Sequence, residues 1–546
     1  MKKIKKFCIL LNHHDDIKLF STNFLNKADL ICKNFYVKLE LKKLDIKIKE
    51  IKLKNFNNKK NDFFYNFKSN WFKDKHNKDY TFFENKFSIG DISKDYITRD
   101  LITFYKNYCL YLQLKKKYDK VFISSKEVDY FKKFVDTSKN FFYYKTSNSY
   151  MDFTKRDVST KFDYNLIKVK NYFIIFRMLQ NFIKFFLLNK SLIFNDPSFK
   201  IFFKKKNFLI LNLINIFRSF YFIKPSKIQK KLSSNHKKMI KQNLIKFDLP
   251  QDFTNIFAEH VYKKLKNNFK LFNTYYSIIH EMINFYRPKT LIVPSLKTFQ
   301  SLIAQYACIN CNVNIIHATD GSNIDLFNDI SFNKKFLEDN KISFIAYSTE
   351  EQKYFKKFVN NKNIKLSSLP LHLNFKENFK KKYDLIVLDY FWSFNNYSIN
   401  SKKDYSYKIL HDILLTFEKT DKKNIAIKFK HTTSQVYFEY KKFVKNNVLN
   451  FFPGLNIDFL EGDFSETLNY SNIFIGGIQT SVIEAIYAKK KYIIYSPNEV
   501  GYDDNYVNKF SIYIKSKQVV RSLNRLKQEI ISKEKIKLKK KLNKFW

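Results

Sequence analysis

The chain has 546 residues, which is too many for one ordinary hydrophobic core and predicts at least two domains. Hydrophobic residues make up 45% of it, and this excludes an intrinsically disordered chain. The formal net charge of +50 would attract polyanions, but the lysines are spread along the whole chain and no nucleic-acid-binding motif is present, so no specific nucleic-acid partner is expected.

The cysteines and the amino terminus indicate the cellular compartment. Five scattered cysteines are too few for a disulfide scaffold, and the single pair Cys308 and Cys311 has no second pair at metal-ligand spacing. The first apolar run, residues 7–11, is too short for a signal peptide. We expect a cytoplasmic protein without metal or cofactor, and the basic charge leaves open a peripheral contact with the inner face of the cytoplasmic membrane.

The first 370 residues alternate between strand and helix patterns. Unalternating apolar strands separated by amphipathic helices are typical of a parallel sheet covered on both faces, so this part is predicted to form one Rossmann-like domain. The expected strands are 4–11, 121–125, 291–294, 313–316 and 343–347, and the expected helices include 99–118 and 297–310.

Residues 160–245 break this rhythm, because they are rich in Phe, Ile and Leu and are interrupted by Lys and Arg. No apolar run in this segment reaches the roughly 20 residues that span a bilayer. We therefore predict a helical, basic and aromatic insertion in the first domain. Two interpretations stay open: the insertion lies in the membrane interface, or it packs against the domain with its lysine stems covering apolar surface.

After a polar linker at 361–382, strand and helix patterns alternate again. The expected strands are 383–389, 424–430, 455–460, 472–476 and 492–495, with helices at 403–418, 434–446 and 480–489. This order predicts a second, doubly wound Rossmann-like domain over 380–510. Residues 515–546 are predicted to form a basic helical tail.

Glycine is rare, so a pair of glycines is informative: the chain has only seven. Gly476 and Gly477 follow an apolar strand directly and precede a helix, which is the arrangement of a phosphate or ribose site. Thr480 and Ser481 are expected to cap that helix, and Glu484 one turn later to accept ribose hydroxyl groups. The alternative is an ordinary capped helix after a tight turn.

The stretch 461–485, followed by the strand at 491–495, resembles the donor-site region of GT-B glycosyltransferases that assemble bacterial capsule and surface polysaccharides. The resemblance places Ser465, Thr480, Ser481 and Glu484 at the donor. Upstream, residues 428–431 (KFKH) resemble the family's Lys-x-His-Pro element, which implies donor-phosphate contacts for Lys428 and His431. Thr432 replaces the proline of that element, and the Lys–His spacing also differs.

Residues 313–322 resemble the turn at which these relatives often carry His-Gly, beside the cleft between the domains. There a His or a carboxylate deprotonates the acceptor hydroxyl, and Asp320 and His317 are the two candidates in this chain. A second cluster, His13, His14, Asp15 and Asp16, follows the first strand and is expected on the acceptor side of the same cleft.

The resemblance implies an α/β fold with two Rossmann-like domains facing a cleft (GT-B-like). It also implies metal-independent transfer of a sugar from a nucleotide-sugar donor to a cell-surface glycan or lipid-linked acceptor. Two alternatives stay open. One is a polyol-phosphate transferase that uses CDP-glycerol or CDP-ribitol, and the other is a non-catalytic polyanion- or membrane-binding protein.

Overall fold

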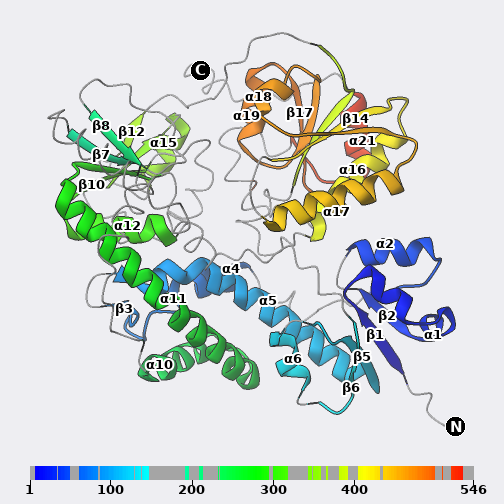
Figure 1. Cartoon of the computed structure of the whole chain (residues 1–546), viewed down its shortest axis with the longest axis horizontal. Helices are drawn as coiled ribbons and strands as arrows, with labels where there is room; N and C mark the ends of the chain where they lie inside the picture. Colours follow the sequence, from blue (N-terminus) through cyan, green and yellow to red (C-terminus); the bar gives the residue numbers. More distant parts are fainter. Residues whose placement is uncertain are drawn as a thin grey trace, which may run out of the picture.

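A computed structural model of the whole chain shows three parallel sheets joined by long helices (Figure 1). The described residues are 6–32, 35–49, 61–83, 87–127, 129–136, 138–146, 191–195, 208–212, 232, 234–293, 299–317, 342–346, 349–357, 364–366, 380–390, 404–430, 435–497, 507 and 518–532.

The amino-terminal sheet has four parallel strands in the order β2-β1-β5-β6. Its central strand β1 is fully buried from Cys8 to Leu11, which explains its unbroken apolar sequence. The strands are β1 (Phe7–Leu11), β2 (Asp29–Cys32), β5 (Lys120–Ser124) and β6 (Phe141–Tyr144), and the helices around them are α1 (Thr22–Lys27), α2 (Phe35–Lys43) and α6 (Asp129–Val135).

Two long helices, α5 (Ile89–Lys117) and α11 (Gln251–Tyr286), pack side by side between the first and second sheets (Figure 1). Their interface is aromatic and ionic: Asp100 of α5 accepts hydrogen bonds from His260 (2.8 Å) and Lys264 (2.6 Å) of α11. Since α5 leads into β5 and α11 leads into β9 (Thr290–Val293), this pair connects the two sheets. The helices α4 (Asn61–Asn70) and α10 (Ser234–Ile245) pack beside them.

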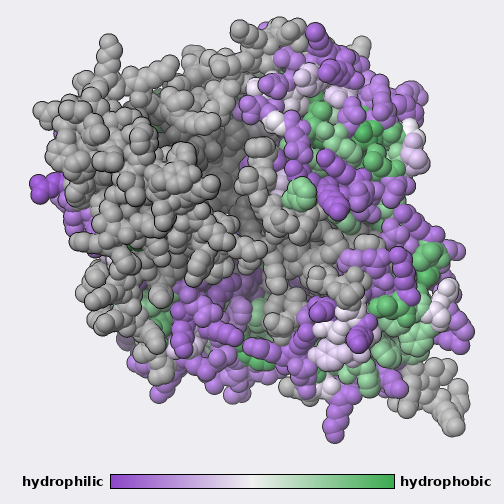
Figure 2. Space-filling view, viewed as in Figure 1, coloured by the Kyte–Doolittle hydropathy of each residue, from purple (hydrophilic) through white to green (hydrophobic). Residues whose placement is uncertain are grey.

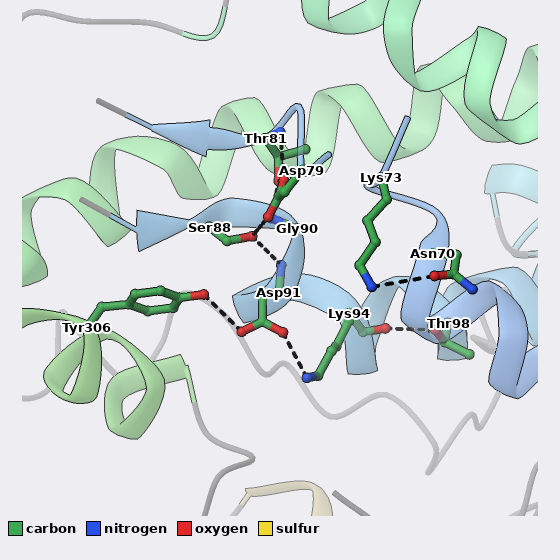
Figure 3. A network of polar contacts seen from close by, with 10 residues as sticks. All are labelled: Asn70, Lys73, Asp79, Thr81, Ser88, Gly90, Asp91, Lys94, Thr98 and Tyr306. Carbon is green, nitrogen blue, oxygen red and sulfur yellow. Dashed lines mark hydrogen bonds and ion pairs between the residues drawn. The ribbon is translucent and has the colours of Figure 1, made fainter. Parts of the chain in front are cut away.

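A polar network fixes the amino terminus of α5 (Figure 3). The Asp91 carboxylate accepts hydrogen bonds from Lys94 (2.8 Å) and from Tyr306 (3.1 Å), which belongs to α12 (Phe299–Asn310). A side chain at Gly90 would collide with Phe72, so only glycine fits there. The start of α5 is therefore held to the helix layer of the second sheet.

The second sheet has six parallel strands in the order β12-β11-β10-β9-β7-β8. Its strands besides β9 are β7 (Ser191–Asn195), β8 (Phe208–Asn212), β10 (Asn314–His317), β11 (Ile342–Ala346) and β12 (Ile364–Leu366), and α15 (Thr349–Phe355) packs on its edge.

Two expectations about this region need correction. Residues 191–195 and 208–212 lie in the predicted helical insertion at 160–245, yet they are strands β7 and β8, paired in parallel with each other. A short apolar run has no period that separates strand from helix, and pairing with β9 decides the outcome. Similarly, β12 occupies part of the expected linker 361–382. Apart from Leu232 and α10, the rest of 160–245 lies outside the described residues.

The third sheet also has six parallel strands, in the order β15-β14-β13-β16-β17-β18. Numbered along the chain, this is the 3-2-1-4-5-6 order of doubly wound dinucleotide-binding folds. The strands are β13 (Leu385–Leu388), β14 (Asn424–Lys428), β15 (Asn456–Leu460), β16 (Ile473–Gly476), β17 (Lys491–Tyr495) and β18 (Val519–Val520), and the helices between them are α16 (Asp404–Glu418), α17 (Gln435–Phe451), α18 (Phe464–Thr467) and α19 (Thr480–Tyr487).

Residues 518–532 of the predicted basic helical tail are part of the domain built on the third sheet, the third domain. Strand β18 completes the sheet, and α21 (Leu523–Ile531) packs on α16 with Leu526 and Ile530 fully buried. The Lys491 ammonium donates hydrogen bonds to the carbonyl oxygens of Glu529 and Ser532, so it satisfies the carboxy-terminal end of α21. The lysine-rich sequence conceals this i, i+4 apolar pair.

The predicted α/β class with Rossmann-like domains is confirmed, and the second and third sheets provide two such domains. The strands expected at 4–11 and 121–125 belong to the first sheet, as β1 and β5, and not to the sheet that contains β9, β10 and β11, so the strands expected in one domain over residues 1–370 lie in two sheets. The first sheet approaches the third domain where α2 meets α16, and the Lys43 ammonium lies 3.7 Å from the ring centre of Phe451. Among the described residues, every helix is too short or too polar to cross a bilayer. On the face that Figure 2 shows, the described surface is mostly hydrophilic, with hydrophobic groups over the third domain and over the amino-terminal sheet.

The packing of α21 predicts unequal costs for two substitutions on the same helix. Leu526→Ala should lower the free energy of unfolding by about 2–5 kcal/mol, because it leaves a cavity under a buried side chain. Leu523→Ala is the matched control, since Leu523 is 42% exposed, and it should change the value by roughly 0.5 kcal/mol or less. Urea unfolding measures both. Equal effects would mean that α21 is only an appended tail.

Candidate functional site

The strand order of the third domain defines one special position on its carboxyl edge. Strands β13 and β16 are hydrogen-bonded neighbours, but the chain leaves them toward opposite sides of the sheet. In doubly wound sheets ligands bind at this switch point, outside the carboxyl ends of the strands. The register pairs Val387 with Ile475, so two residues further Asp389 is level with Gly477. These residues mark the candidate site.

The Gly476–Gly477 turn is organised around the hydroxyl of Tyr492, a fully buried residue of the neighbouring strand β17. A side chain at position 476 would collide with this hydroxyl, which explains the need for glycine. Tyr492 Oη donates to the carbonyl oxygen of Gly477 (3.2 Å), and it lies 3.3 Å from Gln479 Nε2 and 3.4 Å from Ser481 Oγ. The Tyr492 hydroxyl is therefore within hydrogen-bond distance of three residues of the turn and of the start of α19.

Helix α19 begins directly after this turn. Its N-cap is Gln479 in extended conformation, and the Gln479 side chain makes no capping hydrogen bond. Thr480 and Ser481 are the first two helical residues, so the expectation that they cap the helix is wrong in position. The first-turn N–H groups thus lack a side-chain cap, and a helix start of this kind favours an anion.

Glu484 lies one turn into α19 and is partly buried. Within the described part of the chain its carboxylate has no hydrogen bond or ion pair. Burial raises the pKa of this carboxyl group to about 7. An acidic group held without a partner in a partly buried place is characteristic of functional sites, although burial alone can also produce such a shift.

On the other side of the switch point, two tyrosines of α17 orient Asp389. Tyr437 Oη donates to one carboxylate oxygen (2.5 Å) and Tyr440 Oη to the other (3.2 Å). The backbone N–H of Lys430 donates in turn to Tyr437 Oη (2.7 Å). Burial and the Asp389 charge together raise the pKa of both phenols well above the usual range. The acidic group at the end of β13 is thus held in a fixed orientation.

Lys428 and Ser465 lie on the same edge but in different surroundings. The buried Lys428 ammonium donates to the carbonyl oxygens of Phe429 (3.0 Å) and Gly462 (2.6 Å), and desolvation lowers its pKa. Strand β13 lies between β14 and β16, and the Lys428 ammonium binds the loop after β15. Lys428 here supports the loop after β15, and half-buried Ser465 lies in the short helix α18.

Of the two candidates for the catalytic base, only His317 lies among the described residues. Asp320 lies outside the described residues, as does the donor-side candidate His431. His317 ends β10, is 1% exposed and stacks on Phe344 with ring centres 5.0 Å apart. Among the described residues neither of its ring nitrogens has a hydrogen-bond partner, and burial lowers its pKa to about 3. A histidine in this place must become exposed before it can accept a proton from a substrate.

The residues after β1 form hydrogen bonds with one another and with the segment that follows β6 in the first sheet. His13 Nδ1 accepts a hydrogen bond from the backbone N–H of Asp15 (3.1 Å), and so caps the 3-10 helix η1 (His14–Leu19). The carboxylate of buried Asp16 accepts hydrogen bonds from Tyr144 Oη (3.0 Å) and from the hydroxyl of Thr146 (2.8 Å). The side chain of His14 is not among those described. Across the described ranges, no three His, Cys, Asp or Glu side chains gather as metal ligands.

Sequence reasoning missed three groups at the switch point: Asp389, its pair of orienting tyrosines, and Tyr492. The position of Asp389 directly after the buried strand LIVL was a usable signal, because ligand-binding residues follow such strands. The roles of Tyr437, Tyr440 and Tyr492 depend on contacts between separate elements, and no local pattern marks them among 36 tyrosines.

Comparisons with known proteins give weak likenesses. No family model and no curated protein matches the chain. Similar solved structures include the UDP-GlcNAc 2-epimerase of Methanocaldococcus jannaschii in complex with UDP-GlcNAc and UDP (12% identity, 64% of this chain, 95% of that chain, TM-score 0.36). Others are the sucrose-phosphate synthase of Thermosynechococcus elongatus (10%, 48% and 68%, TM-score 0.34) and a mutant of S. aureus TarM with UDP (13%, 47% and 51%, TM-score 0.30). Likenesses of this size do not indicate a function.

The environment of Glu484 predicts a pH-dependent difference between the protein and a Glu484→Gln variant. The folded pKa of about 7 exceeds the ordinary value of 4.5 for a glutamate, so the folded protein loses stability as pH rises from about 4.5 to 7. The variant carries no charge and avoids this loss. It should therefore match the parent at pH 4.5 and exceed it at pH 8 by about 1–3 kcal/mol of unfolding free energy.

Urea unfolding at the two pH values measures this difference. Glu466→Gln provides the control, because Glu466 is an exposed carboxylate on the same edge of the sheet and should give no such gain. Equal stability of the Glu484→Gln variant and the parent at pH 8 would show that Glu484 is solvated like any surface carboxylate.

Proposed function

We propose that this chain is a glycosyltransferase that binds a nucleotide-sugar donor at the β13–β16 switch point of its third domain. The observation that carries the proposal is the 3-2-1-4-5-6 strand order, which brings Asp389 and the Gly476–Gly477 turn together at that point. The sequence resemblance to GT-B donor sites falls on the same turn and helix.

The residues at the turn suit the parts of a nucleoside diphosphate. The glycine backbone permits close approach of a ligand, and the start of α19 favours phosphate oxygens. Glu484 has a carboxylate with no described partner, and it lies one turn from the helix start, so it can accept the ribose hydroxyls. The two hydroxyl groups of a ribose need a hydrogen-bond acceptor such as a carboxylate, whereas a lysine or arginine at this place would bind a further phosphate.

The chemistry proposed is in-line displacement at the anomeric carbon of the donor sugar. An acceptor hydroxyl attacks while the bond to the nucleoside diphosphate breaks, and the positive end of α19 stabilises the negative charge that develops on the leaving phosphate. A base must remove the acceptor proton. The burial of His317 speaks against it in that role, and Asp320 remains the candidate of the sequence resemblance.

A panel of UDP-, GDP-, CMP- and CDP-linked donors, each mixed with purified protein, tests the donor class by thermal shift. The proposal expects stabilisation by one nucleotide-sugar class, by about 3 kcal/mol at a hundredfold excess over the dissociation constant. A response to CDP-glycerol or CDP-ribitol alone would instead favour polyol-phosphate transfer. No response to any member of the panel would overturn the proposed donor site.

Glu484→Ala should weaken binding of the stabilising donor by roughly ten- to a hundredfold, because a charge-assisted hydrogen bond to ribose is worth about 1.5–3 kcal/mol. Isothermal titration calorimetry measures the change, and the exposed Glu466→Ala on the same edge is the matched control. An unchanged dissociation constant for Glu484→Ala would remove the ribose contact from the proposal.

A further inference from the structure

The hydrogen bonds around Tyr492 are limited by the number of protons. A phenol has one proton to donate and can accept at its oxygen. In the structure that proton goes to the carbonyl oxygen of Gly477 (3.2 Å). Gln479 Nε2, at 3.3 Å, can only donate to the phenol oxygen. Either hydroxyl can donate in the 3.4 Å contact between Ser481 Oγ and Tyr492 Oη, and Ser481 is the donor as long as the phenol proton goes to Gly477.

This arrangement leaves Ser481 unable to donate to a ligand while it donates to Tyr492. All three contacts are at the long end of hydrogen-bond geometry, so each is weak and rearranges at little cost. A phosphate oxygen at the start of α19 is a much stronger acceptor than a phenol oxygen. It would therefore draw the Ser481 proton away from Tyr492.

We propose that Tyr492 is a positioning residue whose hydroxyl changes its acceptor when an anionic ligand binds at the Gly476–Ser481 turn. The Tyr492 hydroxyl turns from the Gly477 carbonyl and donates its hydrogen bond to Ser481 Oγ, and the Ser481 hydroxyl donates its hydrogen bond to the ligand phosphate. No covalent bond breaks, and each oxygen keeps its own hydrogen. The inference rests on the proposed donor site and adds to it a chain of two hydroxyls, with the second one buried and out of reach of the ligand.

The burial of Tyr492 makes this role distinct from ligand contact. Its side chain is 0% exposed, so its hydroxyl reaches a ligand only through Ser481 or through the backbone of the turn. Donation by Tyr492 polarises the Ser481 hydroxyl and makes it a stronger donor to phosphate. A tyrosine that only filled space between β16 and β17 would act independently of Ser481, and this difference can be measured.

The test is a double-mutant cycle on binding of UDP, GDP and CDP by isothermal titration calorimetry, using the full chain and the nucleotide that binds most tightly. Ser481→Ala should weaken binding about tenfold, the size of one hydrogen bond to phosphate. Tyr492→Phe keeps the buried ring and should weaken binding several-fold. Because Tyr492 acts through Ser481, the double variant should bind no more weakly than Ser481→Ala alone.

Tyr383→Phe is the matched control, because its hydroxyl donates to Asp458 Oδ2 (2.8 Å) at the opposite edge of the same sheet. Tyr383→Phe should leave the nucleotide affinity of the parent unchanged, and it should also leave the affinity of the Ser481→Ala variant unchanged. Gly476→Ala, whose added Cβ would displace the Tyr492 hydroxyl without removing it, is the second variant if Tyr492→Phe does not fold. Its effect should exceed that of Tyr383→Phe and should shrink in the Ser481→Ala background.

Two failures can be told apart. If the parent protein binds none of the three nucleotides, the donor site falls and this inference falls with it. If the parent binds and Glu484→Ala weakens binding, but the factors for Tyr492→Phe and Ser481→Ala multiply in the double variant, the donor site stands and the hydroxyl chain is overturned.

Discussion

The pairing of β13 with β16 is the constraint on which the candidate site depends. These two strands are neighbours in the sheet but are separated in the chain by two strands and three helices, and only this pairing brings Asp389 level with Gly477. Their side chains are buried on both faces, which fixes the register, because parallel strands with two covered faces cannot slip without exposing apolar residues. The contacts of Tyr492 around the turn depend in addition on the pairing of β16 with β17.

Most elements of the third domain could be predicted from the sequence, because its strands are short, mostly apolar and separated by amphipathic helices. The segment LIVL of β13 and the segment KYIIY of β17 are examples. The glycine pair was identifiable for the same reason, since glycine is rare in this chain and follows β16 directly. Strand order was not available from these patterns. It is a tertiary property, and it was needed to recognise Asp389.

The errors have physical causes as well. Strands β7 and β8 were assigned to a helical insertion because apolar runs of five residues carry no distinguishing period. Residues 515–546 are interpreted as a tail because lysine is frequent across this stretch, but within α21 two buried residues, Leu526 and Ile530, decide the packing. For Lys428, the sequence resemblance implies a phosphate contact, and the structure adds that the carbonyl oxygens of Phe429 and Gly462 accept two of its three N–H bonds.

The topology of the third domain also bears on how the chain folds during synthesis. All strand partners in this sheet lie between residues 385 and 520, and even its last two strands join elements already adjacent in the chain. The first sheet differs, because β1 must wait for β5, more than a hundred residues later, before it has its second neighbour. Pairings over such distances are slow and leave strand edges exposed meanwhile. During synthesis from the amino terminus, one edge of β1 therefore stays unpaired until β5 has been made, and such an edge can pair with another chain.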